Sequence, residues 1–340
     1  KKLGITKEDI GVKISVDDYN KACRTEVMKY TDIWNNLTKK MGYWVDMEHP
    51  YITYENKYIE SVWYLLKMLY DKKLLYKGYT IQPYSPAAGT GLSTHELNQP
   101  GCYRDVKDRT AVAMFKLAAN PNFNLGENAY FLAWTTTPWT LPSNTALAVG
   151  KEIDYVAIAT FHPTSKIHEA VVLILAKALV SKYFPEKNAA LALESYKAGD
   201  KEIPFKVLCE FKGKHLEGLR YEQLLPFAKP NDGDAFKVVL GDFVTTEDGT
   251  GIVHLAPSFG ADDFRVARAN GIGSLTLVDR RGKFLPEVKD EVFLYGDEYV
   301  KEAYLTDEEK EREFKKQKNI LEQNGKIKEL KGYLSVDERI

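Results

Sequence analysis

The stretch 248–270 changes its pattern twice over a short distance, and it restricts the folds open to this chain more than any other segment. Turn-forming residues lead into a short apolar strand over 252–255, which carries His254 among apolar neighbours. A proline and a glycine end the strand, and a short helix then begins at two carboxylates, Asp262 and Asp263. A strand, a glycine-flanked loop and a helix start commonly present side chains to a ligand. Since one aspartate is enough to cap a helix, a purely structural role stays open.

Composition places the chain in a broad class. Its 340 residues are enough for about two domains, and 44% hydrophobic with 28% charged residues is ordinary for a globular protein. No apolar run reaches membrane-spanning length and the start has no signal-peptide core, so we expect a cytoplasmic protein with no membrane partner. Because the sequence begins without methionine, we expect a fragment or a processed form. A net charge of −1 disfavours a general nucleic-acid coat but leaves room for a local basic face.

Cysteine usage is typical of a reducing compartment. Cys23, Cys102 and Cys209 are odd in number and widely separated along the chain. This spacing argues against a disulfide framework and against a thiolate metal site. We therefore expect no metal-ligating residue in the site.

The segment from Thr53 to Leu75 has helical spacing. Thr53 is the expected N-cap, and Gly78 is expected to end the helix. Large apolar side chains recur every three or four residues, at Ile59, Val62, Trp63, Leu66, Leu69 and Tyr70. Such a stripe is typical of a buried core face, so we predict packing and no chemistry. The stretch 81–97 reads as a loop in which His95 and Glu96 are structural.

From residue 101 onward the pattern becomes that of strands. Alternation and β-branched residues predict strands over 112–116, 130–134, 145–149 and 155–160. The apolar stretch 169–184 is predicted as a buried helix and 241–255 as a hairpin. The charged stretch 306–330 is predicted as a solvated helical extension. Pairing between strands of the two halves would bring residues near 135 beside His254 and Asp263.

The second unusual stretch is 134–144, with the sequence WTTTPWTLPSN. Four threonines within six residues place several hydroxyls along a short backbone path. Pro138 and Pro142 fix the backbone and keep the stretch out of a sheet interior. A strand end whose threonines pair with backbone groups is the structural alternative, and on the residues alone it stays open.

Together with GTGIVHLAPSFGADDF at 249–264, this stretch resembles the paired signatures of the editing domain of the isoleucyl-tRNA synthetases. The stretch 42–99 resembles the segment that leads into that domain, so the likeness covers most of 40–285. The sister valine and leucine enzymes usually carry an arginine after the second threonine, where this chain has Thr137. The resemblance implies an α/β chain in which a β-barrel-like editing domain is flanked by helices from the class I synthetase body.

The resemblance also implies a division of the chain and a set of cofactors. Residues 1–99 would lead from the catalytic domain, 100–305 would form the β-rich editing domain, and 306–340 a charged helical extension. Neither the HIGH-type nor the KMSKS-type ATP signature occurs, so we expect no cofactor in this fragment and ATP with Mg²⁺ in the parent synthetase. The cysteine pairs that hold zinc in some relatives near 80–97 are absent too, which leaves zinc without ligands.

The implied reaction is hydrolysis of the ester in tRNA(Ile) mischarged with valine. The expected catalytic residues are Thr135, Thr136, Thr137, His254 and Asp263. The aspartate would bind the α-ammonium group, kept ionised by the helix N-terminus, and the hydroxyls would orient water and the ribose. The residues expected to bind the substrate are Trp134, Trp139, Thr140, Asn144 and Asp263.

Two of these residues have open alternatives. His254 is a wall of the amino-acid pocket, a base, or a buried structural histidine. Asn144 either holds the loop or meets the terminal adenosine. The expected partners are the acceptor end of tRNA(Ile) and the valine moiety, and we expect a monomer. Residues expected either to meet tRNA phosphates or to form a solvated surface are Arg265, Arg268, Arg280, Arg281 and Lys283.

Two other functions remain as alternatives. One is an editing domain of a valine- or leucine-type synthetase, which the missing arginine after Thr136 disfavours. The other, of a different class, is a non-catalytic tRNA-binding module.

Overall fold

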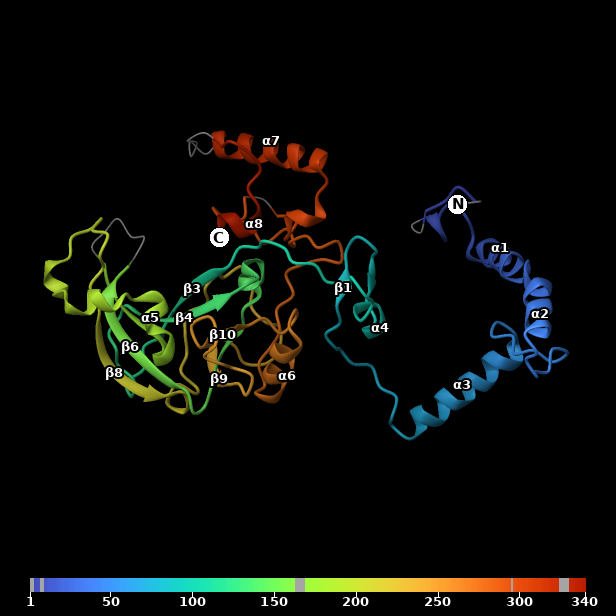
Figure 1. The fold of residues 1–340 in the computed structure, drawn as a ribbon, viewed down its shortest axis with the longest axis horizontal. Helices are drawn as coiled ribbons and strands as arrows, with labels where there is room; N and C mark the ends of the chain where they lie inside the picture. Colours follow the sequence, from blue (N-terminus) through green and yellow to red (C-terminus); the bar gives the residue numbers. More distant parts are fainter. Residues whose placement is uncertain (1–2, 7–8, 163–168, 295, 324–329) are drawn as a thin grey trace. The chain divides into compact units, whose positions relative to one another are not determined.

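The structure is a computed structural model that describes residues 3–6, 9–162, 169–294, 296–323 and 330–340. The chain divides into two compact units, Lys1–Gly78 and Tyr79–Ile340 (Figure 1). The expected three-part division, with boundaries after 99 and 305, stays a prediction. Among the described residues, no helix combines the length and the apolar character needed to cross a membrane.

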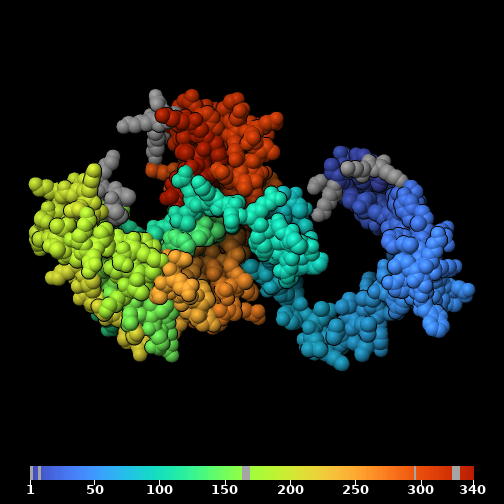
Figure 2. All heavy atoms as spheres, viewed as in Figure 1, coloured from blue at the N-terminus to red at the C-terminus, as the bar shows by residue number. Residues whose placement is uncertain are grey.

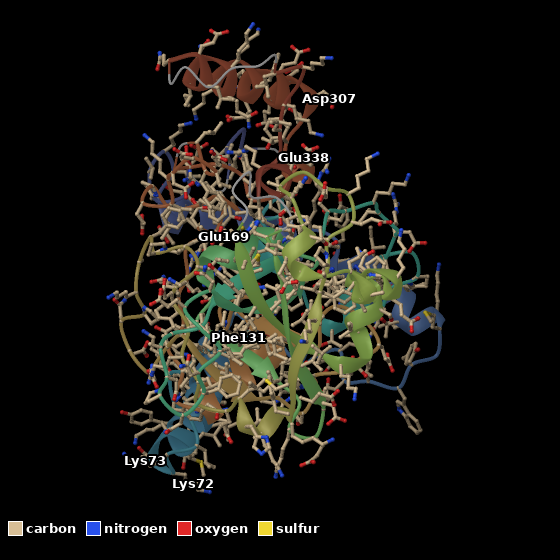
Figure 3. All side chains as sticks on the ribbon, turned by 90° about the vertical axis from the view of Figure 1, so that its left-hand side faces the viewer. Lys72, Lys73, Phe131, Glu169, Asp307 and Glu338 are labelled. Atoms are coloured by element: carbon tan, nitrogen blue, oxygen red, sulfur yellow. The ribbon has the colours of Figure 1, made fainter. Side chains whose placement is uncertain are left out.

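In the part of the first unit that the structure describes, the α-helices are α1 (Val16–Met28), α2 (Thr31–Lys40) and α3 (Asn56–Asp71). The predicted limits of the third helix, Thr53 to Leu75, are wrong. Its N-cap position is Glu55, and it ends at Asp71, well before Gly78. The early end has a local cause: Lys73 takes the left-handed conformation with φ 60°, which interrupts the helical backbone. Figure 3 labels Lys72 and Lys73 at this end.

The apolar stripe of α3 is exposed within its unit, so its prediction as core is wrong. No residue of α3 is buried, and the side chain of Trp63 is 69% exposed. Neither α1 nor α2 has a buried residue, so the described residues of the first unit form no core into which this stripe packs. Helical periodicity shows which face is apolar, but only the tertiary structure shows what covers that face.

The second unit begins with a small hairpin and a single helical turn. Strands β1 (Tyr84–Ser85) and β2 (Thr90–Gly91) pair antiparallel, and α4 (Thr94–Leu97) follows. Ser93 and Glu96 form a reciprocal capping box at the start of α4, with Glu96 accepting from the Ser93 N–H at 2.7 Å. The structural role predicted for Glu96 is thus confirmed, although 81–97 is less irregular than expected.

The centre of the second unit is a mixed sheet. Its strands are β3 (Ala111–Lys116), β4 (Ala129–Thr135), β5 (Ala146–Val149), β6 (Asp154–Phe161), β7 (Ala170–Ala176), β8 (Lys206–Lys212), β9 (Lys237–Leu240) and β10 (Ile252–Leu255). The order is β8-β6-β7-β4-β10-β5-β9, and β3 pairs with β4. All four strands predicted from residue 101 onward are confirmed within a residue or two.

Two predictions in this region are wrong. The stretch 169–184 is strand β7 followed by two short turns, η3 (Lys177–Leu179) and α5 (Val180–Tyr183), and not one helix. Because both faces of β7 are largely covered, its apolar run shows no alternation and reads like a buried helix. The stretch 241–255 contains only one strand, β10, which pairs with β5 and β4 and forms no hairpin.

Backbone pairing closes part of the sheet into a ring. One edge of β4 is shared, with β7 paired to its beginning and β10 to its end at Trp134, while β3 occupies the other edge. Bridges from Leu117 to Tyr221 and from Arg220 to Lys237 connect β3 to β9. The circuit β3-β4-β10-β5-β9 is therefore complete, and the expected barrel-like fold is confirmed.

The interior of this ring holds the main core. Its side chains come from alternate positions of the strands, including Phe115, Phe131, Leu147, Val238 and Ile252, all with an exposed fraction of 1% or less. Figure 3 shows Phe131 among the strands. On the outer face, helix α6 (Ala261–Ala269) packs Val266 and Ala267 against β5 and β10. A third cluster covers the opposite faces of β6 and β7.

Shorter elements complete the second unit. Besides η3, the second unit contains the 3₁₀ helices η2 (Pro138–Ser143), η4 (Glu186–Ala190), η5 (Leu193–Ser195), η6 (Gly213–His215) and η7 (Glu302–Tyr304). The charged tail contains α7 (Asp307–Gln323), as predicted, and α8 (Val336–Arg339). Gln317 differs from the otherwise solvated tail because its side chain is buried. Its amide nitrogen donates to the Leu334 carbonyl, and its amide oxygen accepts from the Leu334 N–H. Residues 324–329 of the predicted extension lie outside the described residues.

Gly251 is expected to tolerate no side chain. It has φ +73°, and an added Cβ would lie 2.3 Å from the Cβ of Ala176 on β7. Replacement by alanine should lower the free energy of unfolding by about 2–4 kcal/mol, from the left-handed backbone and from overpacking. Gly271 is the matched control, because its φ is +65° and nothing lies within 4 Å of its added Cβ. Gly271→Ala should cost only about 1–2 kcal/mol. Equal losses in denaturant unfolding would contradict a steric role for Ala176.

Candidate functional site

The site lies where the apolar interior of the ring becomes polar. On β10, Ile252 faces the core and His254, two residues on, takes the same side. On β4, Ala133 faces the core and Thr135 follows at the same spacing. Since Val253 pairs with Trp134, these two polar residues lie at the same level near the ends of adjacent strands. The expected approach of the threonine stretch to His254 is confirmed.

The four threonines Thr135, Thr136, Thr137 and Thr140 all line the cleft, and two of them also hold the backbone. The buried Thr135 hydroxyl accepts from the Thr137 N–H at 3.0 Å, and the buried Thr140 hydroxyl donates to the Thr137 carbonyl at 2.8 Å. The Thr137 hydroxyl has only long contacts of 3.4 Å to its two threonine neighbours. Thr136 is exposed and lines the cleft. Thr136 and Thr137 therefore retain hydrogen-bonding capacity for a ligand.

His254 is a neutral, buried histidine. Its Nε2 lies 3.1 Å from the hydroxyl oxygen of Thr140, whose own proton is directed at the Thr137 carbonyl. Nε2 therefore donates and Nδ1 carries the lone pair, which has no hydrogen-bond partner among the described residues. Burial lowers the pKa of His254 to about 4. At neutral pH the ring is uncharged, and it lines the cleft.

Asp263 faces the cleft from the first turn of α6. Its carboxylate accepts from the Ala256 N–H at 2.8 Å, which ties the helix to the end of β10. Burial raises the pKa of Asp263, and this opposes the expected stabilisation of the ionised form at the helix start. The carboxylate has room because Gly260 has no side chain: an added Cβ there would lie 2.6 Å from Cγ of Asp263.

Neither aspartate is the N-cap of α6, so the capping alternative is wrong. The N-cap position is Gly260, which makes no side-chain cap hydrogen bond. Asp262 is exposed and forms an ion pair with Arg265 at 3.2 Å. The two neighbouring carboxylates thus have different surroundings, one in the cleft and one at the surface.

The two tryptophans take different positions. Trp134 lines the cleft and packs against Gly249, whose absent Cβ would lie 2.9 Å from the indole ring. Trp139 also lines the cleft, and its ring contacts Phe259 edge to face at a centroid distance of 5.0 Å. Both are therefore placed as flanks of the site, as the sequence predicts.

Asn144 lies outside the cleft. It is 3% exposed; its amide donates to the Ala146 carbonyl at 2.9 Å, and its oxygen accepts from the Tyr221 hydroxyl at 2.6 Å. These contacts hold the end of η2 against the sheet. The loop-holding alternative is the one that the structure supports, and a contact with a terminal adenosine is not, because both polar atoms are used internally.

Sequence reasoning misses the second wall of the cleft. The cavity has a volume of about 1230 Å³. Besides the predicted residues, its walls come from 80–91 and from the segment near Arg280, and include Phe259, Val300 and Tyr304. Figure 2 shows the β1–β2 hairpin and α4 as a teal lobe of the second unit. No local pattern marks these residues, because they reach the cleft only through tertiary packing.

The basic residues are mostly engaged in ion pairs. Arg265 contacts Asp242 at 2.7 Å, Arg281 contacts Asp279 at 2.7 Å, and Lys283 lies over the ring of Tyr299. Arg268 is exposed on the outer helix α6. Arg280 differs from the others because it is exposed and lines the cleft. It is the member of the set best placed to meet a bound phosphate.

The cleft residues do not fit a metal ion. Within the described ranges, no group of three or more histidine, cysteine, aspartate or glutamate side chains is arranged to hold one. Cys23, Cys102 and Cys209 are free cysteines.

Comparison with known proteins gives a family and a set of close relatives. The profile of the class I tRNA synthetases (I, L, M and V) matches residues 1–328. The isoleucine--tRNA ligase of Cytophaga hutchinsonii is 63% identical over 350 positions, covering 100% of this chain and 30% of that protein. The isoleucine--tRNA ligase of Bacteroides thetaiotaomicron is 60% identical over 328 positions, covering 92% and 28%. The chain thus spans about 30% of the length of these curated relatives.

Among solved structures, similar chains include leucyl-tRNA synthetase editing domains. The cytosolic domain from P. knowlesi gives a TM-score of 0.34 at 17% identity, covering 47% of this chain and 62% of that one. The corresponding P. falciparum domain gives 0.32 at 14% identity, covering 62% and 64%. At these TM-scores the likeness carries no argument.

Asp263→Asn is expected to raise the free energy of unfolding near pH 7. Since the folded pKa is raised, the folded state binds the proton more tightly than the unfolded state, whose aspartates titrate near about 3.9. Ionisation of Asp263 therefore lowers stability as the pH rises through its folded pKa, and an uncharged amide removes that loss. Urea unfolding at about pH 7 and pH 3.5 should show the gain only at the higher pH. Asp262→Asn, at the exposed ion pair, is the control and should show little change at either pH. A gain of equal size at both pH values would contradict this account.

Proposed function

The chain belongs to the class I tRNA synthetases of the isoleucine, leucine, methionine and valine group, and we propose that its second unit is the editing region of an isoleucine-specific member. The proposed reaction is hydrolysis of the ester that joins valine to tRNA(Ile). One observation carries this proposal: the threonine stretch, His254 and Asp263 line a single cleft at the end of the ring. The isoleucine--tRNA ligases that are similar over nearly the whole chain support the choice of amino acid.

The substrate chemistry requires little activation from the protein. An aminoacyl ester is reactive because the α-ammonium group withdraws electron density and the leaving group is a vicinal diol. A site for its hydrolysis needs to hold the substrate in place, bind the ammonium group, donate to the developing oxyanion and position a water. The cleft has hydroxyls and a carboxylate for these tasks, and a substrate hydroxyl can assist the water.

Asp263 is the proposed partner of the substrate ammonium group. Its carboxylate lines the cleft, and one oxygen is held by the Ala256 N–H. Burial raises its pKa, and a bound cation would oppose that shift by favouring the ionised form. Partial burial also strengthens the attraction between the two charges, because less water screens them.

Thr136 and Thr137 are the proposed ligands of the water and of the ribose. Their hydroxyls retain hydrogen-bonding capacity, whereas the hydroxyls of Thr135 and Thr140 are already used to fix the backbone. A hydroxyl both donates and accepts, so it can hold a water while donating to an oxyanion. Thr135 and Thr140 then act indirectly, by holding this short segment in place.

His254 is the proposed wall against isoleucine. Its lowered pKa and its contact with Thr140 favour a fixed neutral ring over a general base. One methylene in an apolar pocket is worth only about 1–3 kcal/mol, a limit for which the isoleucine-specific synthetases are themselves the standard example. A second site that accepts valine and excludes isoleucine by size therefore removes the errors of the first. Rigid walls serve this purpose because overpacking is costly where side chains cannot move.

The activity and the partner of the whole synthetase, of which this chain spans a part, are also proposals. We propose isoleucine attachment with ATP and Mg²⁺ for the parent protein. Among the described residues no side-chain group is arranged to hold a metal ion, and the proposed hydrolysis uses the hydroxyls and the carboxylate of the cleft. The acceptor end of tRNA(Ile) is the proposed partner, with Arg280 beside the cleft as a phosphate contact. A monomeric state stays a prediction.

Asp263→Ala should strongly slow deacylation of valyl-tRNA(Ile) while the chain stays folded. Loss of one charge-assisted contact corresponds to a fall in kcat/KM of roughly 10- to 150-fold. Release of labelled valine measures the rate, and circular dichroism reports the fold. Asp262→Ala is the matched control and should keep its activity, because that carboxylate faces Arg265 at the surface. Near-normal hydrolysis by folded Asp263→Ala would remove this residue from the site. A wild-type chain that binds tRNA but releases no valine would favour a tRNA-binding module.

His254→Ala should let the chain deacylate correctly charged isoleucyl-tRNA. Removal of the ring enlarges the pocket, so the ratio of isoleucyl- to valyl-tRNA hydrolysis should rise by roughly tenfold or more. His254→Gln, which keeps a bulky side chain able to donate to Thr140, should retain most of the parent ratio. If both rates of the alanine variant fall together at an unchanged ratio, the wall is built by other residues.

A further inference from the structure

The start of η2 has a backbone donor that the helix itself cannot satisfy. The first N–H groups of a helix have no acceptor within it, and Pro138 has no N–H at all. Trp139 is therefore the first residue of η2 with an N–H to place. Thr137, at the N-cap position, makes no side-chain cap hydrogen bond. The acceptor comes from far along the chain, because the Trp139 N–H donates to Oδ1 of Asp337 on α8 at 3.0 Å.

The carboxylate of Asp337 is held from both sides. Its side chain is 6% exposed, and while Oδ1 accepts from Trp139, Oδ2 lies 2.6 Å from Nζ of Lys301. Lys301 also lies 2.6 Å from Asp108. Burial of a carboxylate is costly unless it is both paired with a cation and hydrogen-bonded. Here Oδ2 pairs with Lys301 and Oδ1 accepts the hydrogen bond from Trp139. The side chain is thus fixed in one orientation.

Trp139 connects this carboxylate to both halves of the cleft. Its neighbour Thr140 accepts from His254, and its indole ring packs against Phe259 in the loop that precedes Asp263. Val336, beside Asp337, is 1% exposed in the cluster against which Trp139 also packs. A shift of the Trp139 backbone would therefore move Thr137 and Thr140 relative to His254.

We propose that Asp337 is a positioning residue of the site: by accepting the Trp139 N–H it holds η2 in the place where the threonine hydroxyls meet the substrate. This inference rests on the proposed function. Asp337 does not line the cleft and touches no reacting atom, so it acts through the backbone of η2. Displacement of a reacting group by about 1 Å can lower a rate by roughly 100-fold.

The two kinetic constants should respond differently. Asp337→Ala should lower kcat for valyl-tRNA(Ile) deacylation by roughly 10- to 100-fold and leave KM within about twofold, because tRNA contacts elsewhere are unchanged. Asp337→Asn keeps an oxygen that can accept from Trp139 and should restore most of kcat. A role limited to stability would change neither constant in the protein that remains folded.

Amide exchange gives a second readout that is independent of activity. Hydrogen–deuterium exchange of the Trp139 N–H, measured by mass spectrometry on peptides covering 138–141, should accelerate in Asp337→Ala and stay close to the parent rate in Asp337→Asn. The matched control is Arg109→Ala, which removes an exposed ion pair to Glu338, the next residue on α8, without touching η2. It should leave both kcat and the exchange rate at parent values.

The outcomes separate this inference from the proposed function. A wild-type chain that does not deacylate valyl-tRNA(Ile) overturns the proposed function and this inference with it. With an active wild type, faster Trp139 exchange in Asp337→Ala at unchanged kcat overturns the inference alone, as does an unchanged exchange rate. If Asp337→Ala does not fold, Asp337→Asn decides: any acceleration of exchange must be accompanied by a fall in kcat, and a parent-like kcat with fast exchange overturns the inference.

Discussion

The parallel pairing of β10 with the end of β4 is the contact on which the site depends. β7 occupies the beginning of the same edge of β4, so only its last residues, around Trp134, are open to β10. Because side chains alternate along a strand, this register places Thr135 and His254 on one side, above the apolar interior of the ring. A shift of one residue would turn His254 away from the threonines and into the outer cluster packed against α6.

The titratable side chains of the site, His254 and Asp263, lose contact with water through burial. Burial lowers the pKa of His254 to about 4 and raises that of Asp263, so each is displaced toward its neutral form. Such shifts oppose stability, and they are common where a protein keeps a group for its chemistry. The same exclusion of water strengthens electrostatic attraction within the cleft. Glycines make the arrangement possible, because Gly260 and Gly249 leave the space that Asp263 and Trp134 occupy.

The wrong predictions have a common origin in what covers an apolar segment. In β7, neighbours on both faces remove the alternation by which a strand is recognised, and a run of valine, leucine and isoleucine then reads as a helix. In α3 the period is that of an amphipathic helix, yet its apolar face is uncovered within its unit. The period of a sequence reports local geometry and leaves the partner of each face undefined.

The sequence by itself determined the elements with strong local signals and the chemistry of the two motifs. The four early strands, the helix that begins at the paired aspartates, and the candidate residues of the threonine stretch all follow from patterns that extend over a few residues. Only the tertiary structure decided which of these groups face the cleft. Asn144 turns inward to Tyr221, and the Trp139 N–H donates to Asp337, 198 positions away. The physical reason is that hydrogen-bond partners and burial are set by contacts distant in sequence, which no local pattern encodes.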